Sequence, residues 1–307
     1  ALGMLQPLLK QSSAGFGIGG FNGVPSVCYS LARCADFLAE PSLRERARFF
    51  AHRLTPEQIK NDRTFDVLSG SAGAILALLA LHDSTGDERC LETAILAGDH
   101  LLASRSENAW VTMDNTCLGG FSHGTSGIAP ALLKLFERTG NDAYRAAAEA
   151  ALEWEATLFS PEAENWRDLR GETGFGVSWC HGAPGIALGR FLSLPILDTP
   201  RVRADLEVAL STTRKIPLVA KDPPCCGNTG RADILLEAGR HFGRPEWIEA
   251  SRGILAQCRF LAERDGGFAL DGLPRRLSQP SFFTGLAGIG YMFLRQIHPL
   301  PCVLALS

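Results

Sequence analysis

A glycine pair of the form GxxG occurs six times along the chain, and this repeat limits the possible fold more than any other feature. The pairs begin at Gly20, Gly70, Gly124, Gly182, Gly227 and Gly285. Successive pairs lie 45 to 58 residues apart, a period typical of repeat architectures. Because the repeat extends over nearly all of the 307 residues, we expect residues 1–307 to form a single domain.

Two kinds of helical sequence alternate around these glycine pairs. An apolar run such as AILALLALH (74–82) follows each pair, whereas runs with a polar stripe, such as NDAYRAAAEAALEWEATLF (141–159), lie between pairs. A helix that is apolar around most of its circumference is buried on both sides, and a striped helix has one solvated face. No segment has the alternating pattern of a strand. The sequence therefore predicts an all-α fold, an α/α barrel or toroid with an inner ring of helices inside an outer ring.

The glycine pairs also predict where a site lies. Glycine allows close approach of backbones, and the first turn of a helix has free N–H groups. If all inner helices begin at the same end of the ring, that end is the expected site. Segments 160–178 and 264–283 are long and lack helical periodicity, so we expect them to form a rim that holds an extended substrate.

Three cysteines lie at two of these helix starts. Cys180 precedes Gly182 by two residues, and Cys225 and Cys226 come directly before Gly227. A catalytic zinc has three protein ligands and one open position, and cysteine is a common ligand. An adjacent pair is a less usual ligand spacing than C-x-x-C, so three buried thiols near helix starts are the alternative. Their matching positions in the repeat favour a metal site at the ring centre.

The remaining cysteines are interpreted differently. Nine cysteines, an odd number, are scattered along a chain that can form a large core, which argues against a disulfide framework. We interpret the following cysteines as small apolar side chains buried in the core: Cys28, Cys34, Cys90, Cys258 and Cys302.

Two histidines and one carboxylate are candidates for acid–base chemistry. His123 comes directly before Gly124 and so shares the register of the cysteines. His181 lies next to Cys180. It is an acid–base group, a group that contacts the metal ligands without binding the metal, or a replacement ligand. Asp66 lies four residues before Gly70 and can reach the same end of the ring, although a helix cap or loop carboxylate is the alternative.

Charge and hydropathy exclude several classes of partner. The net charge is −3 with both signs spread along the chain, so no footprint for nucleic acid or an anionic membrane is present. No run reaches the ~18 to 20 apolar residues of a membrane span. The first residues, ALGMLQPLLK, lack the pattern of a signal peptide. We therefore expect a cytoplasmic protein.

Three motifs in order, GFSHGTSGIA, SWCHGAPGIALGR and CCGNTG, resemble those of the lanthionine synthetase cyclase family. The ending LPCVLALS resembles the close of the cyclase half of two-domain class II lanthipeptide synthetases, so the chain is consistent with a part excised from a longer synthetase. The resemblance implies an α/α toroid with one zinc ion. It also implies a dehydrated precursor peptide, leader plus core, as substrate and a dehydratase domain in the same or a partner chain.

The resemblance further implies a reaction and a set of residues. The reaction adds a peptide cysteine thiol to dehydroalanine or dehydrobutyrine and closes a thioether ring. By motif match, Cys180, Cys225 and Cys226 are the zinc ligands, His123 is the acid–base residue and Asp66 is the upstream acidic residue. A histidine suits protonation of the enolate that the addition produces. His181 is expected to help stabilise charge.

The sequence departs from the family pattern at two places. Most members have histidine where this chain has Cys226, and CCG resembles a substrate-tolerant subset of class II enzymes. A third thiolate adds negative charge to the site, so we expect a more reactive and less selective cyclase. Many members also have an arginine just before the first zinc cysteine, whereas residues 176–179 read GVSW and the nearest upstream arginine is Arg170.

Three other functions are weighed against a cyclase. A zinc protein could bind thiols or thiol peptides without turnover. A protein prenyltransferase subunit would mix carboxylate, cysteine and histidine ligands, which the adjacent cysteine pair argues against. A glycosidase toroid needs paired carboxylates at the ring mouth. The sequence offers no evident second carboxylate at the glycine-pair helix starts to pair with Asp66.

Overall fold

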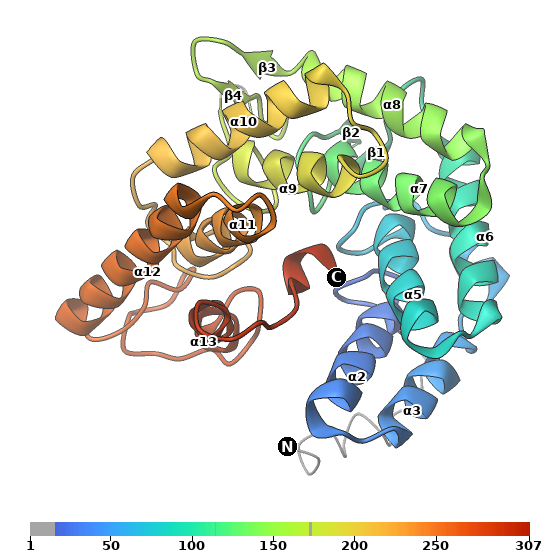
Figure 1. Cartoon of the computed structure of the whole chain (residues 1–307), viewed down its shortest axis with the longest axis horizontal. Helices are drawn as coiled ribbons and strands as arrows, with labels where there is room; N and C mark the ends of the chain where they lie inside the picture. Colours follow the sequence, from blue (N-terminus) through green and yellow to red (C-terminus); the bar gives the residue numbers. More distant parts are fainter. Residues whose placement is uncertain (1–15, 114, 172–173) are drawn as a thin grey trace.

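The computed structural model describes residues 16–113, 115–171 and 174–307, and in these ranges twelve α-helices form two concentric layers (Figure 1). The inner helices are α2 (Val24–Leu38), α5 (Ser71–Thr85), α7 (Thr125–Thr139), α9 (Ala183–Ser193), α11 (Asn228–His241) and α13 (Leu286–Arg295). The outer helices are α3 (Ser42–Ala51), α6 (Glu88–Ser104), α8 (Asp142–Ala156), α10 (Pro200–Lys215) and α12 (Pro245–Asp265), with a short α4 (Pro56–Lys60) after α3. This arrangement confirms the predicted α/α toroid.

Burial separates the two layers as the hydrophobic patterns predicted. Inner helix α5 is buried continuously from Ser71 to Leu79, because it packs against α2 and α7 within its layer and against α6 outside it. Outer helix α8 buries one face, which includes Ala147 and Ala151, and leaves its polar stripe exposed. The hydrophobic core is therefore the space between the two layers and between neighbouring inner helices.

The glycine pairs have a steric function at the inner helix starts. In five repeats the first glycine is the N-cap, and the second lies three residues further on, in the first turn. A Cβ on that second glycine would lie 1.8 to 2.3 Å from the carbonyl oxygen of the residue six positions earlier. These contacts pair Gly73 with Val67, Gly127 with Phe121, Gly185 with Trp179, Gly230 with Pro224 and Gly288 with Phe282. Each loop thus crosses directly over the helix that follows it, which only glycine permits.

The first repeat has a different register. Helix α2 is capped by Gly23, the second glycine of GFNG, and Ser26 occupies the place that glycine fills in the other repeats. Helix α2 is therefore the apolar run, residues 24–38, that follows this glycine pair. The segment GIGGFNG contains several glycines, so the pattern alone leaves the register open. A hydrogen bond from Val24 N to Gly17 O (2.8 Å) fixes the observed start.

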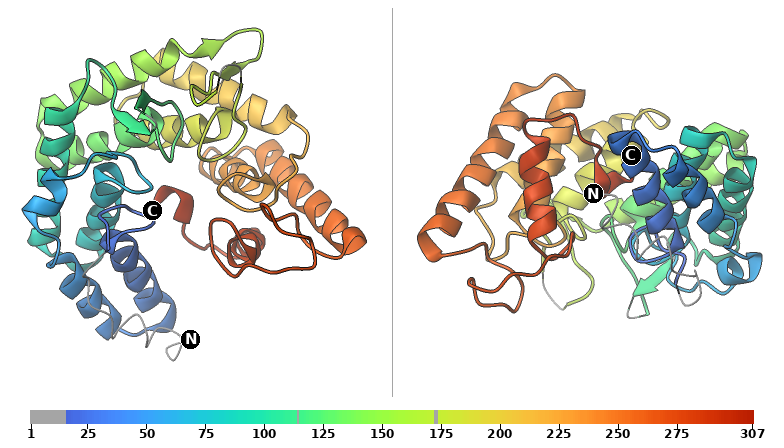
Figure 2. Two further views of the ribbon diagram at one scale, coloured as in Figure 1. Left: turned by 180° about the vertical axis from the view of Figure 1, so that it is seen from behind. Right: turned by 90° about the horizontal axis from the view of Figure 1, so that it is seen from below.

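The end of the chain lies inside the ring (Figures 1 and 2). The 3₁₀ turn η1 (Val303–Ala305) follows α13, and the Trp179 indole Nε1 donates a hydrogen bond to Leu304 O at 3.1 Å. Tyr29 on α2 donates to Ser307 O at 3.0 Å. The final residues therefore connect α2 with the loop before α9 across the ring.

No described helix is long and apolar enough to cross a membrane.

Short strands accompany the helices. Strands β1 (Val111–Met113) and β2 (Thr116–Cys117) form an antiparallel pair before α7. Strands β3 (Phe159–Ser160) and β4 (Asn165–Trp166) form another within the long segment before α9. The prediction of an all-helical chain overlooked these pairs because two- or three-residue strands are too short to show a period.

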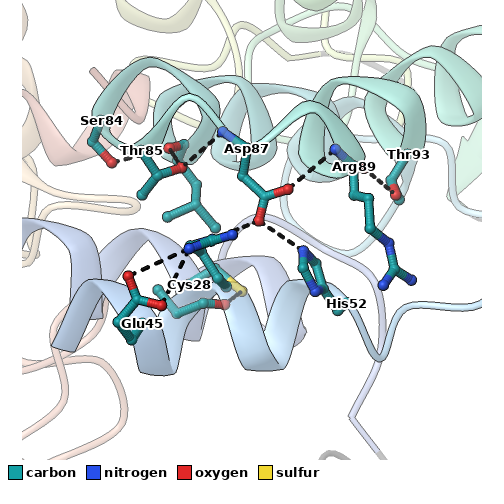
Figure 3. A network of polar contacts seen from close by, with 11 residues as sticks. Cys28, Glu45, His52, Ser84, Thr85, Asp87, Arg89 and Thr93 are labelled. Carbon is teal, nitrogen blue, oxygen red and sulfur yellow. Dashed lines mark hydrogen bonds and ion pairs between the residues drawn. The ribbon is translucent and has the colours of Figure 1, made fainter. Parts of the chain in front are cut away.

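Asp87 links the outer helices α3 and α6 (Figure 3). Its carboxylate accepts from Arg89 N at the start of α6 and contacts Arg48 Nε and His52 Nε2, each at 2.7 Å. Burial opposes ionisation, but the bonds from Arg48 and His52 hold the pKa of Asp87 below its usual value. A carboxyl with a lowered folded-state pKa stabilises the fold above its unfolded-state pKa, and this stability is lost as pH falls through the folded-state value.

We predict that Asp87→Asn lowers the free energy of unfolding at neutral pH by about 1–2 kcal/mol, because a helix cap, the ion pair with Arg48 and the hydrogen bond with His52 are weakened. Urea unfolding followed by circular dichroism measures the change. The difference from wild type should shrink as pH falls below about 4. Glu45→Gln is the matched control, because Glu45 pairs with Arg48 but caps no helix, and its effect should stay under about 0.5 kcal/mol. Equal losses at pH 3 and pH 7 would contradict the assigned ion pairs.

Candidate metal centre

The loops that precede the inner helices lie side by side at one end of the ring. Gly20 N donates to Val67 O at 3.2 Å, and Val67 N donates to Ser122 O at 3.1 Å, which joins the first three loops. Cys225 N donates to Phe283 O at 3.1 Å and joins the last two. Side chains just before the inner helices are therefore gathered at a common mouth, as the repeat predicted.

Aromatic side chains of these loops pack against one another. The rings of Phe21, Trp179 and Phe283 contact one another, with centroids 4.7 to 5.3 Å apart. They come from three different loops, so their contact fixes the loops' relative positions. Trp179 immediately precedes Cys180, and the Phe283 carbonyl holds the Cys225 amide. The two cysteine-bearing loops are thus supported by one apolar cluster.

Three thiols meet at the mouth. The Sγ atoms of Cys180 and Cys226 are 3.5 Å apart, those of Cys225 and Cys226 are 3.1 Å apart, and all three lie within 4.8 Å of one another. All are free cysteines. A tetrahedral zinc ion with bonds of about 2.3 Å separates its sulfur ligands by about 3.8 Å. The donor set and its spacing fit a single metal ion, so this cluster could hold a metal.

The local backbone presents these sulfurs at different depths. Cys180 is 4% exposed, and its Sγ lies 3.1 Å from Ser178 Oγ in a turn closed by Ser178 N and His181 O. Gly182 ends this turn with φ +82°, a conformation that glycine adopts without strain. Cys226, by contrast, is exposed. The cluster is anchored in the protein at Cys180 and open toward solvent at Cys226.

The cluster favours one thiolate. The contacts with Cys180 and Cys225, helped by the charge of Lys221, lower the pKa of Cys226, while the contacts with Cys180 and Cys226 raise the pKa of Cys225. The neighbouring thiols thus favour the charged form of the most exposed sulfur. A negative sulfur beside two thiols is a suitable starting point for metal binding, which needs deprotonated ligands.

Asp66 and His123 form a hydrogen-bonded pair at the same mouth. His123 Nδ1 lies 2.7 Å from Asp66 Oδ2, and the other carboxylate oxygen accepts from Ser69 N at 2.7 Å. Asp66 is 2% exposed, and burial raises its pKa although the bond to His123 opposes the shift. The preceding Phe65 has φ 59°, a strained conformation for a bulky residue. Asp66 is therefore a buried carboxylate of the loop before α5 that is bonded to His123.

His181 lies against His123. Their ring centroids are 5.6 Å apart with nearly parallel planes. His181 is 2% exposed, and its Nε2 has no hydrogen-bond partner among the described residues. Burial, followed by the positive charge of Arg170, lowers the pKa of His181 to about 4. The imidazole is therefore neutral near pH 7. The backbone of His123 is held as well, because Thr112 Oγ1 on β1 donates a hydrogen bond to His123 O at 2.5 Å.

Two ion pairs in the loops before α9, α11 and α13 were not singled out by the sequence. Arg170 pairs with Asp168 in the loop before α9, and Lys221 pairs with Asp271 across the loops before α11 and α13. Asp168, Arg170 and Asp271 belong to the long segments that were expected to form the rim.

Known structures share this fold at low sequence identity. Nisin cyclase matches with a TM-score of 0.59 and 16% identity, covering 99% of this chain and 95% of that chain. A GH76 α-mannanase from Bacteroides thetaiotaomicron matches with a TM-score of 0.57 and 12% identity, covering 89% and 83%. An unsaturated glucuronyl hydrolase from Bacillus sp. matches with a TM-score of 0.53 and 16% identity, covering 81% and 78%.

A family model described as lanthionine synthetase C-like protein matches residues 1–303. This match covers almost the whole chain, including all three cysteines of the cluster and the Asp66–His123 pair. The resemblance found in the motifs is therefore confirmed at the level of the family. The chain belongs to the lanthionine synthetase C-like protein family.

Proposed function

We propose that residues 1–307 act as one zinc-dependent lanthionine cyclase domain, of the type found in class II synthetases. The substrate would be a dehydrated precursor peptide, whose cysteine thiols add to dehydroalanine or dehydrobutyrine. The observation that supports this proposal is the placement of the three-cysteine cluster and the Asp66–His123 pair at the same mouth. The similarity of the fold to nisin cyclase supports it further.

The proposed roles follow from the geometry of the side chains. Cys180, Cys225 and Cys226 would hold one zinc ion, which would supply the Lewis acidity that keeps a substrate thiol deprotonated. The Asp66 carboxylate accepts the Nδ1 proton of His123, so the tautomer and ring orientation of His123 are fixed and Nε2 is left for proton transfer. His123 Nε2 would first take up the proton that the substrate thiol loses. As the thiolate sulfur bonds to the β-carbon, the alkene electron pair forms an enolate, and His123 returns that proton to the α-carbon, so no atom is gained or lost overall.

The carbohydrate-active neighbours in the fold suggest a glycosidase as the other enzyme class, and the carboxylates argue against it. Asp62 is the carboxylate nearest to Asp66 in sequence and is buried. Its Oδ1 accepts from Thr64 and its Oδ2 accepts from Ser71 N and Oγ at 2.8 and 2.6 Å. Asp62 therefore caps α5 and is no free partner for Asp66 in two-carboxylate chemistry.

A thiol-counting experiment separates cyclisation from thiol binding alone. The zinc-loaded protein is incubated with a dehydrated, cysteine-containing peptide, and the remaining thiols are alkylated and counted by mass spectrometry. We expect alkylatable thiols to disappear while the peptide mass stays unchanged, because addition within the peptide neither gains nor loses atoms. Peptide that binds but keeps all its thiols after long incubation would identify a binding module instead.

Cys226 is expected to control reactivity and selectivity. A site with three thiolates is more negative than one with two thiolates and a histidine, so less electron density is drawn from an incoming sulfur. We predict that Cys226→His keeps zinc but slows cyclisation by about tenfold and narrows the set of rings formed. Rates and ring patterns on two different dehydrated peptides measure both effects. An unchanged rate together with an unchanged ring pattern would refute the electronic argument.

A further inference from the structure

A buried carboxylate of the outer layer reaches the loop that carries His123. Glu155 lies near the end of outer helix α8 and is fully buried. Its Oε1 accepts a hydrogen bond from Gly120 N at 2.8 Å. Gly120 precedes His123 by three residues in the loop before α7. A carboxylate buried this deeply depends on its hydrogen bonds, so Glu155 and the backbone of this loop hold each other in place.

The second oxygen of Glu155 is held by two side chains of the inner layer. Oε2 accepts from Ser126 Oγ at 2.5 Å and from Arg190 Nη1 at 2.7 Å. Arg190 is also fully buried, and its Nε and Nη2 each donate to Asp205 Oδ2 at 3.1 Å. These side chains come from α7, α9 and α10, which lie around α8 at this part of the ring (Figure 1). The position of the Glu155 carboxylate is therefore set by helices of both layers.

Gly120 packs against the backbone of the first zinc-ligand candidate. Its φ is +92°, and a Cβ at this position would lie 2.5 Å from Cys180 O and 2.9 Å from His181 Cα. Ser122 O of the same loop accepts from Val67 N at 3.1 Å, which joins it to the loop before α5. The loop before α7 is thus bonded to one neighbouring loop and packed against another. Its position sets the distances among the site residues that the three loops carry.

We propose that Glu155 is a positioning residue of the acid–base site, which sets the place of His123. Gly120 transmits the position, because its N–H is bonded to the carboxylate and its Cα packs against the backbone at Cys180. Proton transfer depends on the distance between donor and acceptor, so a small displacement of this loop slows the reaction. The proposal rests on the proposed function, in which His123 is the acid–base group.

Glu155→Gln is the informative variant, because an amide cannot replace a carboxylate that accepts through both oxygens. Whichever way the amide is turned, its NH₂ group faces a donor, either Gly120 N or Arg190 Nη1. Arg190 keeps its bonds to Asp205, so its charge remains paired. We expect cyclisation at saturating peptide to slow about ten- to hundredfold, with KM and zinc content within about twofold of wild type.

A double-mutant cycle separates positioning from a general loss of stability. If Glu155 acts through His123, Glu155→Gln should cost less than about twofold in protein that already carries His123→Asn. Losses of equal size in both backgrounds would overturn the proposal. Glu153→Gln makes the same charge change at an exposed position of α8 and should leave the rate unchanged. Should Glu155→Gln fail to fold, Ser126→Ala replaces it in the cycle, because it removes one bond to the carboxylate and should cost about two- to fivefold.

The histidine rings can also be followed without turnover. NMR of the whole chain with ¹³C-labelled histidine resolves the ring signals, which His123→Asn and His181→Asn assign. Glu155→Gln should shift the signals of these two stacked rings and leave that of His52, between α3 and α6, unchanged. Unshifted signals in the folded variant would overturn the positioning role, whether or not the wild type forms rings. Shifted signals together with a wild type that forms no rings would refute the proposed function alone.

Discussion

Cys180→Ala is expected to abolish zinc binding and cyclisation together. Cys180 is the buried anchor of the cluster, and its loss leaves two adjacent sulfurs from one loop to hold the ion. Two ligands do not close a stable site, so zinc should fall from about one equivalent to less than about a tenth. Cyclisation of a dehydrated peptide should fall at least about a thousandfold. Metal analysis of the purified protein and thiol counting on the peptide measure the two losses.

The control for this variant is Cys34→Ala. Cys34 is a free cysteine of α2 outside the cluster, so zinc content and activity should stay at wild-type values. Circular dichroism and thermal unfolding of both variants establish that the fold is retained. Stoichiometric zinc in folded Cys180→Ala protein would show that the metal is held elsewhere.

His123→Asn is expected to separate the acid–base step from zinc binding. Asparagine keeps a polar group of similar size but carries no transferable proton at the position of the imidazole. General acid catalysis contributes about a hundred- to ten-thousandfold, so cyclisation should fall by an amount in that range. Zinc content should remain stoichiometric, because His123 is not part of the sulfur cluster. Single-turnover cyclisation and metal analysis on the same preparation measure both quantities.

Two further variants test the assignment of roles within the pair. Asp66→Asn retains a side chain of the same shape but weakens the acceptor for His123 Nδ1, so it should slow cyclisation about tenfold or more with zinc retained. His181→Asn should have a smaller effect than His123→Asn, because no carboxylate of the described residues is hydrogen-bonded to His181. A larger loss in His181→Asn would exchange the proposed roles of the two histidines.

The sequence predicted the layered fold well because the physical cause is local. Helix α2 spans Val24–Leu38, which is the apolar run that follows the first glycine pair, and α5 lacks a polar stripe as a buried helix should. Helix starts were found through a steric requirement, since a Cβ at Gly73 or Gly230 would collide with a carbonyl oxygen. The position of residues 303–305 inside the ring depends on contacts with residues that are distant in the sequence. No local sequence pattern therefore predicts it.

The candidate site was predictable where it follows the repeat and not where it depends on loops. Cys180, Cys225, Cys226 and His123 lie one or two residues before the glycine that caps an inner helix, so a matching register was enough to bring them together. The bond between Asp66 and His123 joins side chains 57 residues apart, and its geometry needed the fold. Arg170 and Lys221 lie outside the repeat register. Their ion pairs with Asp168 and Asp271 depend on how the loops fold, which sequence spacing does not encode.

X-ray absorption spectroscopy at the zinc edge tests the ligand set most directly. The zinc-loaded full chain, free of peptide, should show three sulfur neighbours at about 2.3 Å and one nitrogen or oxygen neighbour at about 2.0 Å. That result would place one metal ion on Cys180, Cys225 and Cys226 with a fourth position for exchange. A shell with two or fewer sulfurs, or one made of nitrogen and oxygen alone, would contradict the three-cysteine centre.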